Sequence, residues 1–202
     1  MSTKPKKNAH HHGNLRAALI DAGIELLEEG GLEALTLRKC AAKAGVSHAA
    51  PAHHFDGLPG LKAAIAIQSF SMFSQSMSEA AAAGDPSPRG VLRSICRGYL
   101  EFGISHPALL KTMFGLGATE ALKYDLQGAG RRAYDILREA CAPFVPDGTA
   151  PEIVEAQVWS LIHGFTLLYI GGQFVHPLPL SIEDGPFDQV TALLDHLGAS
   201  AP

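Results

Sequence analysis

Residues 36–55 read TLRKCAAKAGVSHAAPAHHF, and this stretch decides how the N-terminal part of the 202-residue chain folds. Before the turn, small and apolar residues recur at helical spacing: Leu37, Cys40, Ala41 and Ala44. Gly45 can adopt the positive φ of a tight turn, Val46 can fill the space between two helices, and Ser47 can cap the second helix. The pattern predicts two short helices joined by a tight turn, which is a helix-turn-helix.

Two cations stand at the start of this stretch. Arg38 and Lys39 follow Thr36, the expected N-cap of the first of the two helices. A helix dipole favours anions in its first turn, so two cations there are easier to understand if phosphate lies opposite them. We therefore interpret the hairpin as a DNA-binding element. The alternative is an ordinary pair of short helices with solvated lysines.

Charge is unevenly distributed along the chain, whose net charge is −4. Residues 1–62 carry eight Lys and Arg against six Asp and Glu, and the remainder carries eight against fourteen. This balance argues against a generally basic protein that coats nucleic acid, and it places any phosphate-facing surface near the N-terminus. The length allows two domains. We expect a DNA-binding domain over residues 1–60 and a larger domain over residues 61–202.

The cysteines and the apolar segments indicate the compartment. Cys40, Cys96 and Cys141 lie far apart without metal-ligand spacing, which is typical of buried small side chains in a reducing compartment. The longest apolar stretch, 158–172, is interrupted by polar residues and is expected to be too short to cross a bilayer. The N-terminus shows no apolar signal-peptide segment. We expect a soluble cytoplasmic protein with no membrane partner.

Helix start and stop signals divide the rest of the chain, which shows almost no alternation of period two. The fold class is therefore predicted to be all-α. The expected helices cover residues 15–29, ending at Gly30-Gly31, then 58–83, a segment starting with the cap at Ser87-Pro88, a short helix to Phe114 after His106-Pro107, about 119–141, 153–175 and 187–197.

The last two helices predict a partner-facing surface. Residues 153–175 are apolar nearly all round, so this helix needs cover on both sides, and apolar residues recur at seam-like spacing over 187–197. We expect the two helices to form half of a four-helix dimer interface. The alternative is that both helices are buried within one chain. The residues expected to contact a second copy are Leu161, Phe165, Leu168, Val190 and Leu194.

Several short motifs resemble a known family. HHGNLR at 11–16, GVSHAAP at 45–51 and His54-Phe55 occur in an order and spacing that resemble the DNA-binding domain of the TetR family of bacterial transcriptional regulators. The WSLIHG stretch at 159–164 is similar to the Trp-His-Gly (WHG) ligand-domain subgroup. The resemblance implies a three-helix DNA-binding domain, a helical ligand-binding and dimerisation domain, and a homodimeric repressor that a small effector releases from its operator.

The recognition helix is expected to begin at Ser47 and His48, because residues at the N-terminus of such a helix reach base edges in the major groove. The small residues after them would allow close approach and contact with a thymine methyl. Pro51 falls at the end of the first turn, where it removes at most about one backbone hydrogen bond. His54 could donate to phosphate or pack beside Phe55 as a core residue. The full set of expected DNA contacts is Thr36, Arg38, Lys43, Ser47, His48, Ala49, Ala50, His53 and His54.

Two positions depart from the family pattern. The chain has Ala52 where the family usually has tyrosine, and Leu58 near the usual lysine, and neither side chain can donate to phosphate. DNA affinity is therefore expected to depend on the other donors, including the Lys4–Lys7 arm. The His10–His12 run could instead bind metal, but three histidines without a second cluster make a poor site, so we expect no metal.

Aromatic and methionine side chains of the larger domain are the candidates for an effector pocket. Few charges fall within its helices, so a small, mostly apolar effector is expected. The competing interpretation is that each of these side chains is simply part of the core. The expected ligand contacts are Tyr99, Phe102, Met113, Phe114, Tyr134, Trp159 and His163.

Catalysis is not predicted. His163 has no Ser or Cys nucleophile at a recognisable spacing, and the acidic residues form no paired motif. Gly115-Leu116-Gly117 indicates a helix break and not a phosphate loop, and no dinucleotide fingerprint occurs. A helical scaffold without DNA would leave Arg38 and Lys39 unexplained. We expect a pseudo-palindromic double-stranded DNA operator, a small effector and a second copy as partners, with no cofactor and no enzymatic activity.

Overall fold

The computed structural model of the chain describes residues 15–174 and 186–198, and across them it is all-helical, as the sequence predicts. In chain order the elements are α1 (Leu15–Ala34), α2 (Leu37–Lys43), the 3-10 helix η1 (Ala50–His53), α3 (Gly57–Ala83), α4 (Pro88–Ser105), α5 (Pro107–Gly115), α6 (Ala118–Lys123), α7 (Leu126–Cys141), η2 (Ala142–Phe144), α8 (Pro151–Ile170), α9 (Pro186–Thr191) and η3 (Ala192–His196).

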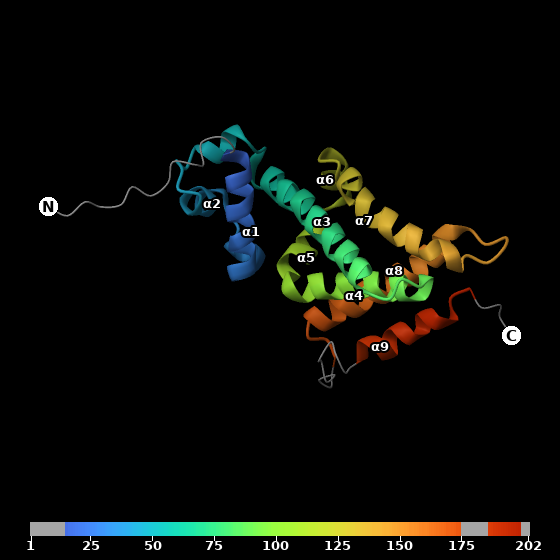
Figure 1. The fold of residues 1–202 in the computed structure, drawn as a ribbon. Coiled ribbons are helices and arrows are strands. Elements are labelled where there is room, and N and C mark those ends of the chain that lie inside the picture. The colour runs from blue at the N-terminus through green and yellow to red at the C-terminus, as the bar shows by residue number, and fades with distance from the viewer. Residues whose placement is uncertain (1–14, 175–185, 199–202) are drawn as a thin grey trace.

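Figure 1 shows two parts of unequal size that are joined by a long helix. α1, α2 and η1 lie together at one end, and α3 runs from them into the bundle of the later helices. α9 lies at an edge of this bundle, away from α2. Buried apolar side chains form one core that extends from Leu19 in α1 to Leu194 in η3, so the two parts share their packing.

Two helix starts show the capping chemistry that the sequence predicts. The Thr36 backbone is extended, and its Oγ1 accepts a hydrogen bond from the N–H of Lys39 at 3.2 Å, which caps α2. Ser87 caps α4 in the same way, with its Oγ accepting from the N–H of Gly90 at 3.1 Å. Pro88 then occupies the first turn, where its missing N–H costs nothing. These caps fix where the two helices begin.

Gly31 interrupts the helix where the sequence predicts, with a non-helical φ of 66° and ψ of −165°, and a further turn to Ala34 continues α1 beyond this kink. Two other helix boundaries differ from the sequence predictions. The helix expected over 119–141 is two helices, because Asp125 has a left-handed φ of 52° and its carboxylate accepts from the N–H of Gly128 at 3.1 Å. The helix expected over 153–175 begins at Pro151 and ends at Ile170.

Two glycines of α4 allow its neighbours to approach closely. A Cβ on Gly98 would lie 2.7 Å from the backbone oxygen of Ser76 in α3, and one on Gly103 would lie 2.4 Å from Cγ2 of Thr166 in α8. Any side chain at these positions would push the helices apart. The Ser76 hydroxyl also donates to the Gly98 carbonyl at 3.0 Å. The close packing places Tyr99 of α4 between α3 and α8.

α8 is long and apolar enough to cross a membrane by length and composition, with a mean hydropathy of 1.3. The sequence argument from the interrupted apolar stretch therefore underestimated this helix. In the structure α8 packs against α4 and α7, and it buries Val154, Val158 and Ile162 in the core. It also buries the carboxyl-bearing Glu155, which contacts Tyr134 of α7. α8 thus packs into the bundle on one face, while Ile153, Leu167 and Leu168 remain exposed.

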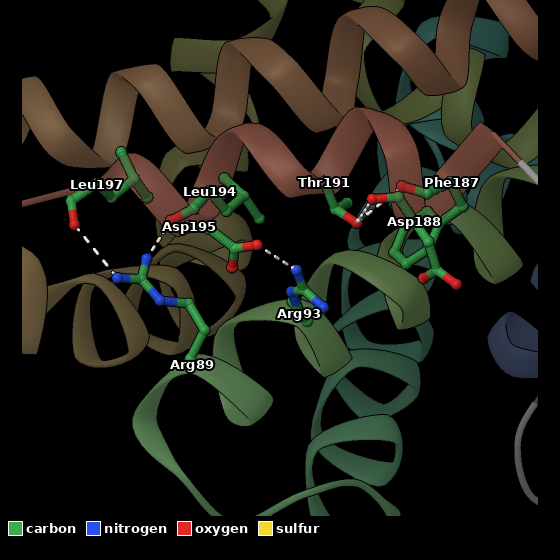
Figure 2. Close-up of polar contacts among 8 residues, drawn as sticks. All are labelled: Arg89, Arg93, Phe187, Asp188, Thr191, Leu194, Asp195 and Leu197. Atoms are coloured by element: carbon green, nitrogen blue, oxygen red, sulfur yellow. Dashed lines mark hydrogen bonds and ion pairs between the residues drawn. The ribbon is translucent and has the colours of Figure 1, made fainter.

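Arginines one helical turn apart on α4 contact the C-terminal segment, which consists of α9 and η3 (Figure 2). Arg89, in the first turn of α4, donates to the backbone oxygens of Leu194 and Leu197. Its guanidinium also lies 4.0 Å from the centroid of the Phe144 ring, which is within cation–π range. Arg89 thereby joins the start of α4 to the end of η3, where the Leu194 carbonyl also accepts from the N–H of Leu197 at 3.2 Å.

The next two arginines extend this attachment along α9 and η3. Arg93 forms an ion pair with Asp195 at 2.6 Å, as Figure 2 shows. Arg97 lies over the ring of Phe187, with its guanidinium carbon 5.1 Å from the ring centroid, and it approaches Asp188 at 3.8 Å. The C-terminal segment is therefore docked on its own chain through several polar contacts.

Two of the residues that were expected to contact a second copy are buried within one chain. Leu194 is 2% exposed and Phe165 is 6% exposed, so both belong to the core. Leu194 is covered because η3 docks on its own chain, and Phe165 of α8 packs against the rings of Tyr169 and Phe174. Leu161 and Val190 are half-buried, and Leu168 is 47% exposed. Only the latter three retain surface for a partner.

Candidate functional site

The turn after α2 has the geometry of a helix-turn-helix. Cys40 and Ala41 are fully buried, and Gly45 adopts a φ of 70° directly after the helix. The N–H of Val46 donates to the carbonyl of Ala41 at 2.9 Å, which closes the turn. Gly45 is therefore at the position where a side chain would be strained, as the sequence predicts.

The element after this turn is not the α-helix that the sequence suggested. Its hydrogen bonds join residues three apart: the N–H of Ala50 donates to Ser47 at 3.0 Å, and the N–H of Ala52 donates to Ala49 at 3.2 Å. Pro51 is the physical reason, since it has no N–H and its ring would clash with the carbonyl four residues earlier. The Ser47 side chain does not cap η1, whose N-cap is Ala49.

Most of the expected DNA contacts lie on the surface. Exposed side chains are found at Thr36, Arg38, Ser47, His48, Ala49, His53 and His54, and Ala50 is half-buried. The exposure of His54 argues against its packing as a core residue. Phe55 is the buried neighbour instead, at 7% exposure, and the Arg16 guanidinium lies 5.4 Å from its ring centroid. The Lys4–Lys7 arm and the His10–His12 run lie outside the described residues.

Lys43 has a different role from the one expected of it. Its ammonium lies 2.7 Å from Glu29 and 3.2 Å from Glu25, both in α1. The hydrogen bond to Glu29, followed by that to Glu25, raises the pKa of Lys43. Its charge is thus already engaged within the chain. Arg38 and Lys39 are exposed, and neither forms an ion pair within the described part of the chain.

Two polar contacts join the N-terminal helices to the bundle. Nδ1 of His106, at the start of α5, lies 2.6 Å from the carboxylate of Glu28 in α1. Asp56, the residue before α3, accepts from the ammonium of Lys123 and from the hydroxyl of Tyr124, the latter at 3.4 Å. The Lys123 ammonium lowers the pKa of Asp56. Asp56 follows the recognition element (residues 47–53) closely, so the C-terminal end of α6 contacts the base of this element.

An apolar cavity of about 410 Å³ lies within the bundle. Five of the expected ligand contacts line it: Tyr99, Met113, Phe114, Tyr134 and Trp159. The remaining wall comes from residues of α3, α4, the α5–α6 region, α7 and α8: Phe70, Phe73, Met77, Ile95, Cys96, Leu116, Ala121, Leu126, Gln127, Gly130, Arg131, Ala133, Leu137 and Ile162. The sequence argument did not select Gln127, Gly130 and Arg131, although they share the helical spacing of Tyr134.

Phe102 and His163, also expected as ligand contacts, do not line the cavity. Phe102 is 3% exposed, and its ring meets that of Phe73 edge-on at 5.3 Å, so it is a core residue. Nδ1 of His163 lies 2.5 Å from the hydroxyl of Tyr99. Burial lowers the pKa of His163 and raises that of Tyr99, which favours a neutral imidazole that accepts from the phenol. His163 therefore orients a cavity residue from behind the wall.

The buried cysteines are not reactive groups. Burial raises the pKa of both Cys96 and Cys141 to about 12, so each remains a thiol at neutral pH. Within residues 15–174 and 186–198, no three or more His, Cys, Asp or Glu side chains gather in a way that could hold a metal ion. Cys96, which lines the cavity, is therefore not a nucleophile at neutral pH.

An exposed helix-turn-helix joined to a helical bundle with an apolar cavity defines a class of DNA-binding regulators. Comparison with known families agrees. A model described as "Bacterial regulatory proteins, tetR family" matches residues 19–61, and one described as "Tetracyclin repressor-like, C-terminal domain" matches residues 92–194, half of the chain. The chain belongs to the TetR family of bacterial transcriptional regulators. It is a DNA-binding regulator and not an enzyme.

Individual proteins are also similar to this chain. HTH-type transcriptional regulator BetI 1 of Chromohalobacter salexigens is 29% identical over 112 residues, and the match spans about half of that relative, 55% of each chain. A protein of unknown function from Rhodococcus sp. RHA1 is 28% identical, with a TM-score of 0.73 over 95% of this chain and 97% of that chain. The regulator FadR from Bacillus subtilis, solved with stearoyl-CoA, shares the fold at 13% identity, with a TM-score of 0.68 over 93% and 100%.

The Trp-His-Gly subgroup is not supported, because the matching C-terminal model describes a different C-terminal family. The structure gives these residues their own local explanation. Trp159 contributes to the cavity wall and its ring lies 6.2 Å from that of Phe114, while His163 holds Tyr99.

Proposed function

We propose that this chain is a homodimeric cytoplasmic repressor that binds a pseudo-palindromic DNA operator and is released by a small, mostly apolar effector. One observation carries the proposal. α3 begins at Gly57, directly after the exposed recognition element, and contributes Phe70, Phe73 and Met77 to the cavity wall. α3 thus reaches from the exposed residues of the recognition element, which we call the reading surface, to the cavity. A ligand that shifts one end of α3 therefore shifts the other.

The dimer is supported by apolar side chains that the chain leaves exposed. Ile153, Leu167 and Leu168 on α8 are 52%, 37% and 47% exposed, and Leu193 on η3 is 62% exposed. Two recognition elements must lie about 34–36 Å apart to enter successive major grooves, and a two-fold interface is the simplest way to fix that distance. An interface over α8, α9 and η3 would cover these four side chains, together with Leu161 and Val190.

The contact between Asp56 and Lys123 offers a second connection between the cavity and DNA. Ala121 of α6 and Leu116 before it line the cavity, and Lys123 at the end of α6 holds Asp56. A ligand that favours a displaced α6 would therefore also move the base of the recognition element. A hundredfold preference for the displaced state supplies about 2.7 kcal/mol of coupling. The fold neighbour solved with stearoyl-CoA supports small-molecule binding in such a bundle.

Operator binding by the purified full-length chain tests the proposal. Fluorescence anisotropy with DNA from upstream of its own gene should show tighter binding than with a scrambled duplex of the same length. Lys39→Ala should weaken binding to both duplexes and reduce the salt dependence. Lys111→Ala is the matched control, since Lys111 is an exposed lysine on α5, outside the reading surface. Equal binding to both duplexes by the unmodified protein would refute the regulator proposal.

The coupling step has its own test. Asp56→Asn and Lys123→Gln each remove one partner of the contact and should reduce the release of operator by an effector, while leaving operator affinity without effector nearly unchanged. The double variant should behave like either single variant, because both act on one interaction. Additive losses in the double variant would show that Asp56 and Lys123 act separately.

A further inference from the structure

We propose that the cavity binds an amphipathic monoanion, with its apolar body enclosed by the bundle and its single carboxylate held by Arg131. This inference deepens the effector part of the proposed function and rests on it. It names the chemical class of the ligand and the residue that selects it, from the distribution of charge in the cavity wall.

Arg131 is the one charged side chain among the described residues that line the cavity. It is exposed on α7, so it stands where the cavity meets solvent. Its side chain has no hydrogen bond or ion pair within the part of the chain that the structure describes. The acidic residue one turn later, Asp135, pairs instead with Arg138 at 3.0 Å. A free guanidinium presents a planar fork of donors that matches a carboxylate.

The rest of the wall is suited to an apolar body. The described lining residues include six aromatic rings and no Asp or Glu: Phe70, Phe73, Tyr99, Phe114, Tyr134 and Trp159 provide the rings. A cationic ligand would meet the charge of Arg131 with no acid in the wall to offset it, and a neutral ligand would leave that charge unpaired. A ligand with one negative charge at the end of an apolar body complements both parts of the cavity.

The hydroxyl groups of the wall already have partners inside the protein. The Tyr99 hydroxyl is bonded to His163, and the Tyr134 hydroxyl donates to the carboxylate of Glu155. Glu155 itself does not line the cavity. The polar groups of the wall that lack such partners in the described structure are on α7, at Arg131 and at Gln127 one turn before it. The polar groups that are available to a ligand therefore lie at one rim of the cavity, on α7.

Trp159 provides a direct readout of binding, because it lines the cavity and is the only tryptophan in the chain. We would titrate the full-length protein with decanoate, decanol and decylamine, each below its micelle concentration, and follow tryptophan fluorescence. The three probes share one apolar body and differ in charge. Decanoate should bind about tenfold more tightly than decanol, because the arginine contact is charge-assisted but solvent-exposed. Decylamine should bind most weakly.

Arg131→Gln should reduce decanoate affinity to that of decanol and leave decanol affinity unchanged, so decanol binding also shows that the variant is folded. Arg132→Gln is the matched control, because Arg132 is the exposed neighbouring arginine and does not line the cavity. This control should bind all three probes like the unmodified protein. Arg131→Glu should reverse the order and favour decylamine.

Three results would overturn the inference: equal affinity for decanoate and decanol in the unmodified protein, an equal loss of both in Arg131→Gln, or no fluorescence response to any probe. None of these measurements involves DNA. Operator binding on the same preparation therefore separates the two proposals. Operator binding without decanoate binding would refute only the ligand assignment, whereas decanoate binding without operator binding would support it and refute the regulator.

Discussion

The two ends of α3 differ in how they are built. Before Gly57, the recognition element is a short run of 3-10 turns with exposed side chains such as His48 and His53. Beyond it, α3 buries Leu61 and Ile65 completely and then contributes to the cavity. The reading surface thus depends on local caps and turns, whereas the cavity depends on packing between distant helices. Side-chain substitutions at one end should leave ligand-free binding at the other end intact, whereas a ligand that displaces α3 should affect both ends.

The largest effect is expected in the core of the bundle. Leu109 of α5 is fully buried, so Leu109→Ala should lower the free energy of unfolding by about 2–5 kcal/mol through lost burial and a residual cavity. Urea denaturation measures this loss. Leu122→Ala, at a leucine that is 70% exposed, is the control and should change stability by less than about 0.5 kcal/mol. Similar losses in both variants would contradict the assigned core.

The next largest effect is expected at the proposed dimer surface. Leu168→Asp places a charge where α8 is expected to meet a second copy, and burying it unpaired should weaken the dimer about a hundredfold. Light scattering and sedimentation would follow the change from dimer to monomer. Leu122→Asp, on α6, adds the same charge outside that surface and should leave the dimer intact. A monomeric unmodified protein at micromolar concentration would refute the proposed dimer.

At the reading surface, His48→Ala should mainly relax sequence preference. If His48 contacts a base edge, the loss of discrimination between operator and mutated operator should be about 1–3 kcal/mol. Because the side chain is exposed, the thermal unfolding temperature should not change. Competition anisotropy with single-base operator variants measures the effect. An equal loss on every sequence would make His48 a phosphate contact instead.

The smallest effect concerns pH. Burial lowers the pKa of His163 below the ordinary value of about 6.5, so below that pH the unfolded chain takes up a proton that folded His163 resists. The contribution of His163 to the free energy of unfolding should therefore be fully present above about pH 6.5 and should be lost as the pH drops below it. Thermal unfolding between neutral and mildly acidic pH measures the slope. His163→Asn should flatten it; an unchanged slope would mean that His163 is not the group responsible.

The same contrast explains which features could be predicted from the sequence. The Thr36 and Ser87 caps and the positive φ of Gly45 depend on neighbouring residues alone, and all three are found in the structure. The effect of Pro51 was underestimated, since one proline in so short a helix converts it to 3-10 turns. The break at Asp125 was missed because a left-handed aspartate has no strong sequence signature.

Features made by distant segments were harder to predict. Lys43 was expected to contact phosphate. Its actual partners were missed because Glu25 and Glu29 come from another helix. Leu194 was expected at a dimer interface because apolar residues recur at regular spacing over 187–197. This spacing does not tell whether the apolar face packs on the same chain or on a second copy, and in the structure Leu194 is buried within the chain. Arg131 was not selected because its importance depends on a cavity whose wall comes from several helices. Spacing predicts helix faces but not their partners.

The proposed coupling joins the cavity to the reading surface through α3 and the Asp56–Lys123 contact. The most direct measurement is a titration of Trp159 fluorescence with decanoate in the presence and absence of saturating operator. If decanoate and the operator favour different states, the operator should weaken decanoate binding by the same factor by which decanoate weakens operator binding, as linkage requires. Superimposable titration curves with and without operator would contradict the claim.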